Sequence, residues 1–364
     1  MTVAHIAQHL ETLAPLHYAE DFDNVGLLVG DASMEVTGIL VTLDTLEHVV
    51  DEAIAGQCNL IVSFHPIIFK GLKTLTGRDY VERTVLKAIK NDIAIFCVHT
   101  ALDNSPLGVN AKLCQVLDIR QPKILLPKKG TIKKLVTHVP KAQLASLREA
   151  LFEAGAGTIG NYDHCSFALE GEGSFRPGEA ANPTVGKRGE THFGDEVQLH
   201  MTFAAAAESN IRKALFHNHP YEEVAYEITT LDNTNQNMGM GMLGTLGAPM
   251  EETAFLEHVK ERLNARGIRH SALLGRPVQK IAVLGGSGSF AIPAALKQGA
   301  DVFLTADLKY HQFFQAEGQI VLLDVGHFET EQFTKNLLVD FLNKKIPNFA
   351  VTLSRSVTNP IKYF

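Results

Sequence analysis

The sequence predicts an α/β fold: a parallel-rich sheet domain, formed by both ends of the chain, with an inserted ferredoxin-like α+β domain. Three observations lead to this prediction. Short apolar segments alternate with helical segments in the first 125 residues, and the same alternation returns after about residue 250. Strands that are apolar throughout are typical of parallel sheets that helices cover on both faces. Between the two ends, the elements follow the different order βαββαβ.

The two ends of the chain, residues 1–125 and 250–364, supply the elements of the sheet domain. Expected strands are short runs of Val, Ile and Leu, and expected helices carry apolar residues three to four positions apart. An amphipathic helix is expected at the start. The expected strands are Gly38–Leu43, Asn59–Ser63, Ile93–Val98, Ile281–Leu284, Val302–Leu304 and Ile320–Leu323, and the expected helices include Leu46–Ala55, Arg78–Asn91 and Glu331–Phe341.

The middle of the chain, residues 131–232, is expected to form the inserted domain. Its elements alternate as strand, helix, strand, strand, helix and strand, which is the ferredoxin-like order. They are Leu135–Val139, Lys141–Ala154, Cys165–Gly173, Glu196–Phe203, Ala207–His217 and Glu223–Leu231. Residues 123–130 and 233–249 contain Pro and Lys or Gly and Met, and are expected to be irregular linkers.

Composition excludes several classes of protein. A net charge of -7 argues against a surface that coats nucleic acid. No apolar run reaches the roughly 18 residues that a membrane-spanning helix needs. His5, His9 and Glu11 interrupt the apolar residues at the start, which is unlike a signal peptide. The four cysteines are scattered without a Cys-x-x-Cys pair, as expected of reduced thiols in a cytoplasmic protein.

Candidate metal ligands follow three of the predicted strands. His65 comes just after one strand, His99 and Asp103 after the next, and His327 and Glu331 after the last. In an open parallel sheet, ligands gather outside the carboxyl ends of the strands, so these side chains are expected to meet in one crevice. Imidazole nitrogens with carboxylate oxygens suit Zn²⁺, Mn²⁺, Fe²⁺ or Co²⁺ better than Ca²⁺.

The pair His327 and Glu331 is the most informative part of this pattern. If a helix begins at the turn formed by Gly326, residues four apart share one face of that helix. Such a pair can hold one divalent ion, or the carboxylate can bridge two ions in a centre suited to hydrolysis. The alternative is a solvated helix face with no ligand.

Two further motifs leave alternatives open. Gly285 and Gly286 lie in a Gly- and Ser-rich turn after a strand, which invites a nucleotide-binding interpretation, although the complete phosphate-loop spacing is missing. Asp307 and His311 follow another strand, and are either partners of the site or a polar helix start capped by the aspartate. Asp23 precedes Asn24 in a Gly-flanked loop, where an Asx turn explains it without a function.

Several segments together resemble the GTP cyclohydrolase 1 type 2 homologue family, also called Nif-three-like. The resemblance covers both ends of the chain in order. It rests on Ala19–Gly30, Ser63–Phe69, His99–Asp103, Thr305–His311 and Gly326–Glu331. The insert resembles the domain that longer bacterial members carry, which is similar to trimeric signalling proteins of the nitrogen-regulatory and copper-tolerance type.

This resemblance implies a two-metal centre in each subunit and a toroidal homohexamer, a trimer of dimers, with the sites facing inwards. The implied ligands are His65, Asp103, His327 and Glu331, with Glu331 bridging. One position departs from the family pattern, because Phe64 stands where the family usually has the first of two adjacent histidines. Phenylalanine cannot ligate, so one metal either binds more weakly, takes an extra water, recruits a neighbour such as His99 or is absent.

The expected function is therefore that of a metal-dependent hydrolase acting on a nucleotide-like or phosphorylated small molecule, in a cytoplasmic homohexamer. One or two divalent ions per subunit are expected, with zinc first and Mn, Fe or Co as alternatives. His99 or His311 is expected to manage the proton. The alternative is a non-catalytic assembly for metal storage, delivery or regulation, with the insert as an effector-sensing module.

Overall fold

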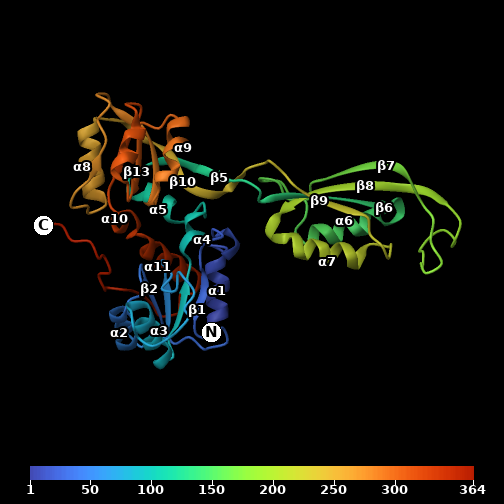
Figure 1. The fold of residues 1–364 in the computed structure, drawn as a ribbon, viewed down its shortest axis with the longest axis horizontal. Coiled ribbons are helices and arrows are strands. Elements are labelled where there is room, and N and C mark those ends of the chain that lie inside the picture. Colours follow the sequence, from blue (N-terminus) through green and yellow to red (C-terminus); the bar gives the residue numbers. More distant parts are fainter. The chain divides into compact units, whose positions relative to one another are not determined.

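The computed structural model describes all residues from 1 to 364, and the chain divides into two compact units (Figure 1). The first unit combines Met1–Leu126 with Met238–Phe364, and the second is Pro127–Asn237. Both ends of the chain thus contribute to one unit, and the middle forms the other. None of the helices has the length and apolar character that crossing a membrane requires.

The first sheet belongs mainly to the N-terminal part and has the order β1-β4-β3-β2-β15. Its strands run parallel except β1, which is antiparallel to β4. Side chains of α1 and α11 pack on one face, and those of α2 and α3 pack on the other. The strands are β1 (Gly26–Val29), β2 (Ile39–Thr42), β3 (Leu60–Ser63), β4 (Ala94–Cys97) and β15 (Val351–Leu353), and the helices are α1 (Val3–Glu11), α2 (Glu47–Ala55), α3 (Tyr80–Lys90) and α11 (Thr334–Lys345). Burial on both faces explains why β2, β3 and β4 are apolar almost throughout.

The second sheet has the order β11-β14-β13-β12-β10-β5. Its centre, β12 to β14, is parallel, and β10 and β11 are antiparallel to their neighbours β12 and β14. Helices α5 and α8 cover one face, and α9 with the short helix η5 covers the other. The strands are β5 (Arg120–Lys128), β10 (Asn235–Met250), β11 (Arg269–His270), β12 (Val278–Ser287), β13 (Val302–Ala306) and β14 (Val321–Asp324), and the helices are α5 (Val109–Val116), α8 (Glu252–Arg262), α9 (Ile292–Lys297) and η5 (Tyr310–Ala316).

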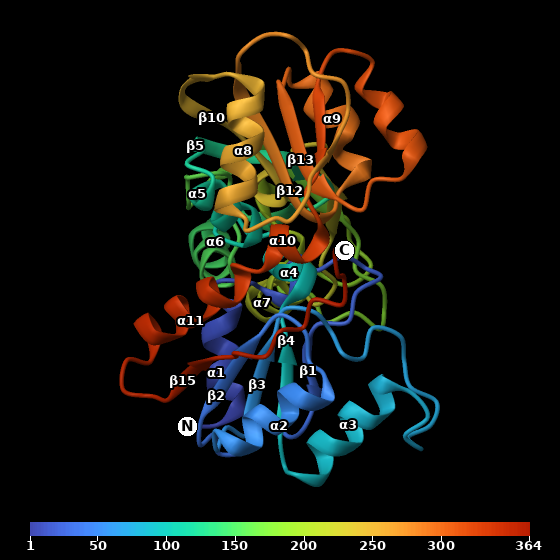
Figure 2. The same ribbon diagram turned by 90° about the vertical axis from the view of Figure 1, so that its left-hand side faces the viewer.

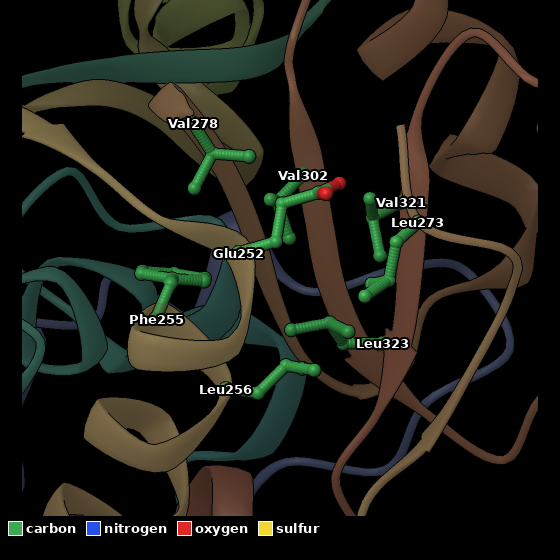
Figure 3. Close-up of a pocket in the computed structure, with 8 residues that line it drawn as sticks. All are labelled: Glu252, Phe255, Leu256, Leu273, Val278, Val302, Val321 and Leu323. Carbon is green, nitrogen blue, oxygen red and sulfur yellow. The ribbon is translucent and has the colours of Figure 1, made fainter. Parts of the chain in front are cut away.

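A small apolar pocket lies where α8 covers the second sheet (Figure 3). Glu252 is the one charged residue among the eight that line it. Its carboxylate accepts hydrogen bonds from the backbone N–H groups of Leu274 and Gly275, at 2.5 and 2.9 Å. This buried acid therefore fastens the loop before β12 to the start of α8, and its position needs no functional explanation.

The sheet domain expected from both chain ends contains two sheets rather than one. The N-terminal and C-terminal strands form separate sheets, one above the other in Figure 2, with α4 (His99–Asp103) and α10 (His327–Glu331) between them. Two strands cross over: β15, from the C-terminal part, joins the first sheet beside β2, and β5, from the N-terminal part, joins the second sheet beside β10. The expected helix over Glu331–Phe341 is likewise two helices, α10 and α11, which are separated by Gln332 and Phe333.

The insert has the predicted ferredoxin-like order. Its four strands form an antiparallel sheet in the order β7-β8-β6-β9, with α6 and α7 packed against it. The elements are β6 (Ile132–Pro140), α6 (Leu144–Glu153), β7 (Ser166–Phe175), β8 (His192–Ala204), α7 (Glu208–Asn218) and β9 (Tyr226–Thr230). Placing the first and third strands at the centre is characteristic of two interlocked βαβ halves.

The two segments expected to be linkers are mostly strand. Residues 123–130 lie largely in β5, and residues 233–249 lie almost entirely in β10. The glycines of β10 permit this pairing, because a Cβ at Gly239 would lie 2.1 Å from the carbonyl oxygen of Leu126. A Cβ at Gly244 would likewise lie 2.6 Å from the carbonyl oxygen of Arg120. These glycines allow two backbones to approach closely, rather than marking an irregular segment.

Candidate metal centre

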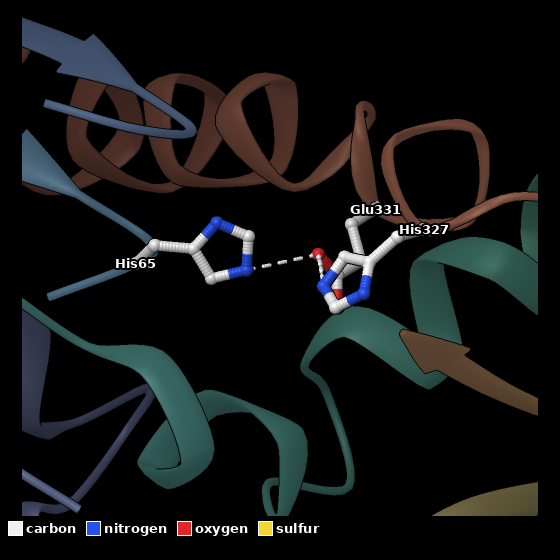
Figure 4. A group of neighbouring side chains, drawn as sticks. All are labelled: His65, His327 and Glu331. Atoms are coloured by element: carbon white, nitrogen blue, oxygen red, sulfur yellow. Dashed lines mark ion pairs between the residues drawn. The ribbon is translucent and has the colours of Figure 1, made fainter. Parts of the chain in front are cut away.

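The carboxyl ends of strands from both sheets bring three ligand-type side chains together. His65 follows β3 of the first sheet, whereas His327 and Glu331 lie on α10, which follows β14 of the second. One ligating atom from each of the three lies within 4.8 Å of the other two, so the group can hold a metal ion. Figure 4 shows His65 facing Glu331, with His327 beside the same carboxylate.

The Glu331 carboxylate is the centre of this group. Its side chain is only 4% exposed, and Oε2 lies 3.1 Å from Nε2 of His65 and 3.2 Å from Nε2 of His327. Oε2 nevertheless makes no well-directed hydrogen bond, and Oδ1 of Asp103 is a second buried oxygen without one. Buried carboxylate oxygens without donors are costly, and a divalent cation would satisfy both. The residues present therefore fit a metal ion.

Each imidazole of the group is oriented by a second carboxylate. Nδ1 of His65 lies 2.8 Å from Asp44, and Nδ1 of His327 lies 2.7 Å from Asp307. Burial opposes ionisation of these two aspartates, yet the hydrogen bonds with the histidines lower their pKa values, so both are charged acceptors. A charged carboxylate can only accept, so Nδ1 carries the proton and Nε2 is the atom left for a metal.

The charges around the group shift three pKa values in the absence of a bound metal. Burial opposes protonation of His65, but Glu331 and Asp44 together raise its pKa to about 10. Burial similarly opposes protonation of His327, but Glu331 and Asp307 raise its pKa to about 9. Burial would raise the pKa of Glu331, but the two imidazoles hold it at about 2. The protons on Nε2 thus occupy the place that a metal would take.

Asp103 lies close to the group without being part of it. It ends α4, and burial, followed by the negative charge of Glu331, raises its pKa well above the usual value. The three closest ligand atoms belong to the other residues. Two carboxylates that repel one another in a buried place are held together readily by a cation between them.

His99 is a third imidazole at the edge of the site. Its ring centroid lies 5.4 Å from that of His65, and its Nδ1 lies 2.7 Å from Oδ1 of Asp23. Burial opposes ionisation of Asp23, but hydrogen bonds from His99 and Thr100 lower its pKa to about 2. The hydrogen bonding of His99 therefore follows the same pattern as that of His65 and His327, and its role as a proton carrier stays a prediction.

The structure does not bring His311 into this group. It is an exposed residue of η5, and its ring contacts are with Tyr310 and Phe314. Phe64, by contrast, is fully buried, with its ring 4.9 Å from that of His65 and 5.6 Å from that of His99. An apolar wall therefore stands at the position where the family resemblance expects a ligand.

The Gly-rich segment that was expected to be a turn is the end of β12, and it serves the candidate metal group rather than a nucleotide. The N–H of Gly285 donates to Asn110, and the N–H of Gly286 donates to Thr330, each at 3.0 Å, so neither is available to a phosphate. Gly286 has a φ of +68°, and a Cβ there would lie 2.3 Å from Oε1 of Glu331. This end of β12 leaves room for the buried carboxylate.

Two partners of the site were missed by the sequence interpretation. Asp44 follows β2 and could have been found by the strand-end rule that found His65. Asp23 was interpreted as an Asx turn, and it does accept the N–H of Asn24, yet it also binds His99. It precedes β1 rather than following a strand, so no local pattern indicates this role.

The fold and site define a class: a two-sheet α/β protein with a histidine–carboxylate centre between the strand ends and a ferredoxin-like insert. The model of the Duf34/NIF3 (NGG1p interacting factor 3) family matches residues 1–360. The chain belongs to this family.

Relatives and solved structures agree with this membership. The chain is 37% identical to a Bacillus subtilis protein named GTP cyclohydrolase 1 type 2 homolog, over 98% of this chain and 97% of the relative. A Staphylococcus epidermidis protein of the same name is 34% identical over the whole of both chains. The crystal structure of a Bacillus cereus protein related to NIF3 is similar, with a TM-score of 0.82 and 36% identity, covering 100% of this chain and 99% of that one.

Removing the charge that orients His65 should weaken metal binding. We expect Asp44→Asn to lower zinc affinity roughly 10- to 100-fold, the range typical of outer carboxylate partners. Competition with a chromophoric chelator measures the affinity. The control is Asp340→Asn, an exposed acid on α11. Equal affinities for the two variants would show that Asp44 does not support a metal ligand.

Metal uptake should release protons. At pH 7 both imidazoles are protonated when no metal is bound, because their pKa values are about 10 and about 9. Each binding event should therefore release up to two protons, and apparent affinity should rise by up to about 100-fold per pH unit until these pKa values are approached. Calorimetry in two buffers of different ionisation enthalpy counts the protons, and a count near zero would contradict the ion-paired arrangement.

Proposed function

We propose that the protein binds divalent metal through His65, His327, Glu331 and Asp103, with one or two ions per subunit. The observation that carries this proposal is the buried Oε2 of Glu331, which lies 3.1 Å from Nε2 of His65 and 3.2 Å from Nε2 of His327, so that one ion could meet all three residues. Two nitrogen and two carboxylate ligands suit Zn²⁺ first, with Mn²⁺, Fe²⁺ and Co²⁺ as alternatives. If two ions are held, Glu331, which has two carboxylate oxygens, would be the residue shared between them.

We further propose that the centre hydrolyses a phosphorylated or nucleotide-like small molecule. A divalent ion held here would supply Lewis-acid polarisation of a phosphate or carbonyl oxygen and would lower the pKa of a water molecule. Asp44 and Asp307 keep the ligand nitrogens aimed at the site. His99, held through Nδ1 by Asp23, offers Nε2 to accept or return a proton. The buried ring of Phe64 excludes water from one side.

Relatives of this chain carry the name GTP cyclohydrolase 1 type 2 homolog. None of the proposed metal-ligating residues would by itself select GTP over another compound. The proposal is therefore limited to phosphorylated or nucleotide-like small molecules. The net charge of -7 supports a small molecule rather than nucleic acid as the ligand. We also propose a homohexamer, a trimer of dimers, on the basis of the family resemblance. The four free cysteines support a cytoplasmic location for it.

A second candidate function is metal storage, delivery or regulation without turnover, with the insert sensing an effector. Phe64 favours it, because a fully buried phenyl ring replaces a donor beside His65 and His99. Two-metal catalysis requires both ions to be held firmly, whereas storage tolerates a weak second site. An assay of enzymatic turnover distinguishes the hydrolase from the storage protein. Hydrolysis of phosphoesters or nucleotides by the metal-loaded protein favours the enzyme, and full loading without turnover favours storage.

Glu331 should be indispensable for metal uptake. Glu331→Gln keeps the shape of the side chain but removes its charge. We expect it to lower metal affinity by more than the roughly 10- to 100-fold that is typical of residues supporting a ligand, so that little metal stays bound. Plasma mass spectrometry of untagged protein measures the content, and circular dichroism checks the fold. The matched control is Glu329→Gln, another buried acid of α10. Full metal content in the Glu331 variant would refute the proposal.

Phe64 should limit the number of bound ions. Four protein ligands complete one tetrahedral zinc, so we expect about one tightly bound ion per subunit in the parent. Phe64→His adds a donor beside His65 and His99 and should raise the content to about two ions per subunit. Two tightly held ions in the parent would show instead that other groups compensate for Phe64.

A further inference from the structure

Two phenylalanine rings lie exposed beside the candidate metal centre. Phe22 is 67% exposed and Phe69 is 45% exposed. Phe22 directly precedes Asp23, the partner of His99, and Phe69 lies four residues after His65. Single exposed aromatic rings are common on protein surfaces, but exposed rings that adjoin one another beside a polar site indicate a ligand-binding role.

These two rings continue a row of rings that leads into the site. The centroids of Phe22 and Phe69 are 6.4 Å apart with their planes tilted by 58°. Phe69 meets the ring of His99 edge-on at 6.2 Å, and His99 meets His65 at 5.4 Å. His65 in turn reaches the carboxylate of Glu331. The phenylalanines thus form the outer end of an arrangement whose inner end is the metal group.

The backbone segments that carry these rings are anchored although the rings are exposed. Beside Phe22, Asp23 accepts hydrogen bonds from the side chains of His99 and Thr100. Asn24 donates from Nδ2 to the carbonyl oxygen of Ile68 at 2.6 Å, which ties the Phe22 segment to the residue before Phe69. A ligand would therefore meet two aromatic side chains whose segments are already ordered, which lowers the entropic cost of binding.

We propose that Phe22 and Phe69 bind the planar heterocyclic ring of the substrate while its phosphate reaches the metal centre. This inference rests on the proposed function and narrows its substrate class to phosphorylated compounds with an aromatic ring. The tilt between the two rings lets a planar base stack on one and meet the edge of the other, which are the two favoured aromatic geometries. Stacking tolerates any base, so it selects a class of ligand rather than one compound.

The surroundings favour a small ligand over a second protein chain as the occupant. The residues that adjoin these rings in the sequence include Asp21 and Lys70, both exposed and charged. The central part of a protein interface is depleted in charged residues, whereas a few apolar rings with polar neighbours are typical of small-molecule sites. Continuity with His99 and His65 further places the occupant at the metal centre.

The test compares two ligands that share a phosphate and differ in the ring. Adenosine 5′-monophosphate and ribose 5-phosphate are titrated into the zinc-loaded full-length protein by calorimetry, for the parent, Phe22→Ala and Phe69→Ala. We expect the parent to bind the nucleotide about 5- to 100-fold more tightly than the sugar phosphate, as one or two stacking rings would produce. Each variant should lose most of this preference while retaining affinity for ribose 5-phosphate and its metal content.

Controls distinguish failure of this inference from failure of the proposed function. Phe193→Ala removes a comparably exposed ring, 61% accessible, from the insert and should leave both affinities unchanged. If the parent binds ribose 5-phosphate as tightly as the nucleotide, the stacking role is overturned while the phosphate site stands. If neither compound binds the metal-loaded protein, both proposals fail. If Phe69→Ala instead changes the sedimentation coefficient, the ring is a contact between copies of the chain and the inference is overturned.

Discussion

The contact of the Glu331 carboxylate with two imidazoles is the interaction on which the arrangement of the first unit depends. A carboxylate that is 4% exposed must be matched by positive charge, and removing one partner of such a buried pair typically costs about 3–5 kcal/mol. His65 comes from the first sheet, whereas Glu331 and His327 follow the second. The carboxyl ends of the two sheets must therefore face each other, with α4 and α10 between them.

A repeated hydrogen-bonding pattern prepares the histidines of the site. His65, His99 and His327 each present Nδ1 to an aspartate, which is Asp44, Asp23 and Asp307 respectively. Each aspartate in turn accepts a hydrogen bond from a hydroxyl group. The hydroxyl donors are Thr358 for Asp44, Thr100 for Asp23 and Ser287 for Asp307. Because Nδ1 is occupied in all three rings, Nε2 is the only ring nitrogen that can meet a metal, a proton or a substrate.

Sequence patterns predicted the structure correctly where the physical rule is local. They failed where the structure depends on pairing between segments that are distant in the chain. Buried strands followed by polar residues predicted that His65, His327 and Glu331 lie together, and the order of six elements predicted the ferredoxin-like insert. Whether two groups of parallel strands form one sheet or two depends on contacts that no local pattern contains. The glycines of β10 were misinterpreted for the same reason, since their meaning depends on the neighbouring backbone of β5.

Phe64 shows how one substitution can change a metal site in two opposite ways. Its ring packs against His65 and His99 and takes no part in ligation. An apolar wall reduces the local dielectric constant, which strengthens the attraction between Glu331 and any cation that it holds. The same wall supplies no donor for a second ion. A centre built in this way would bind a first ion more strongly than a second, so the proposed hydrolysis would depend on whether one ion suffices.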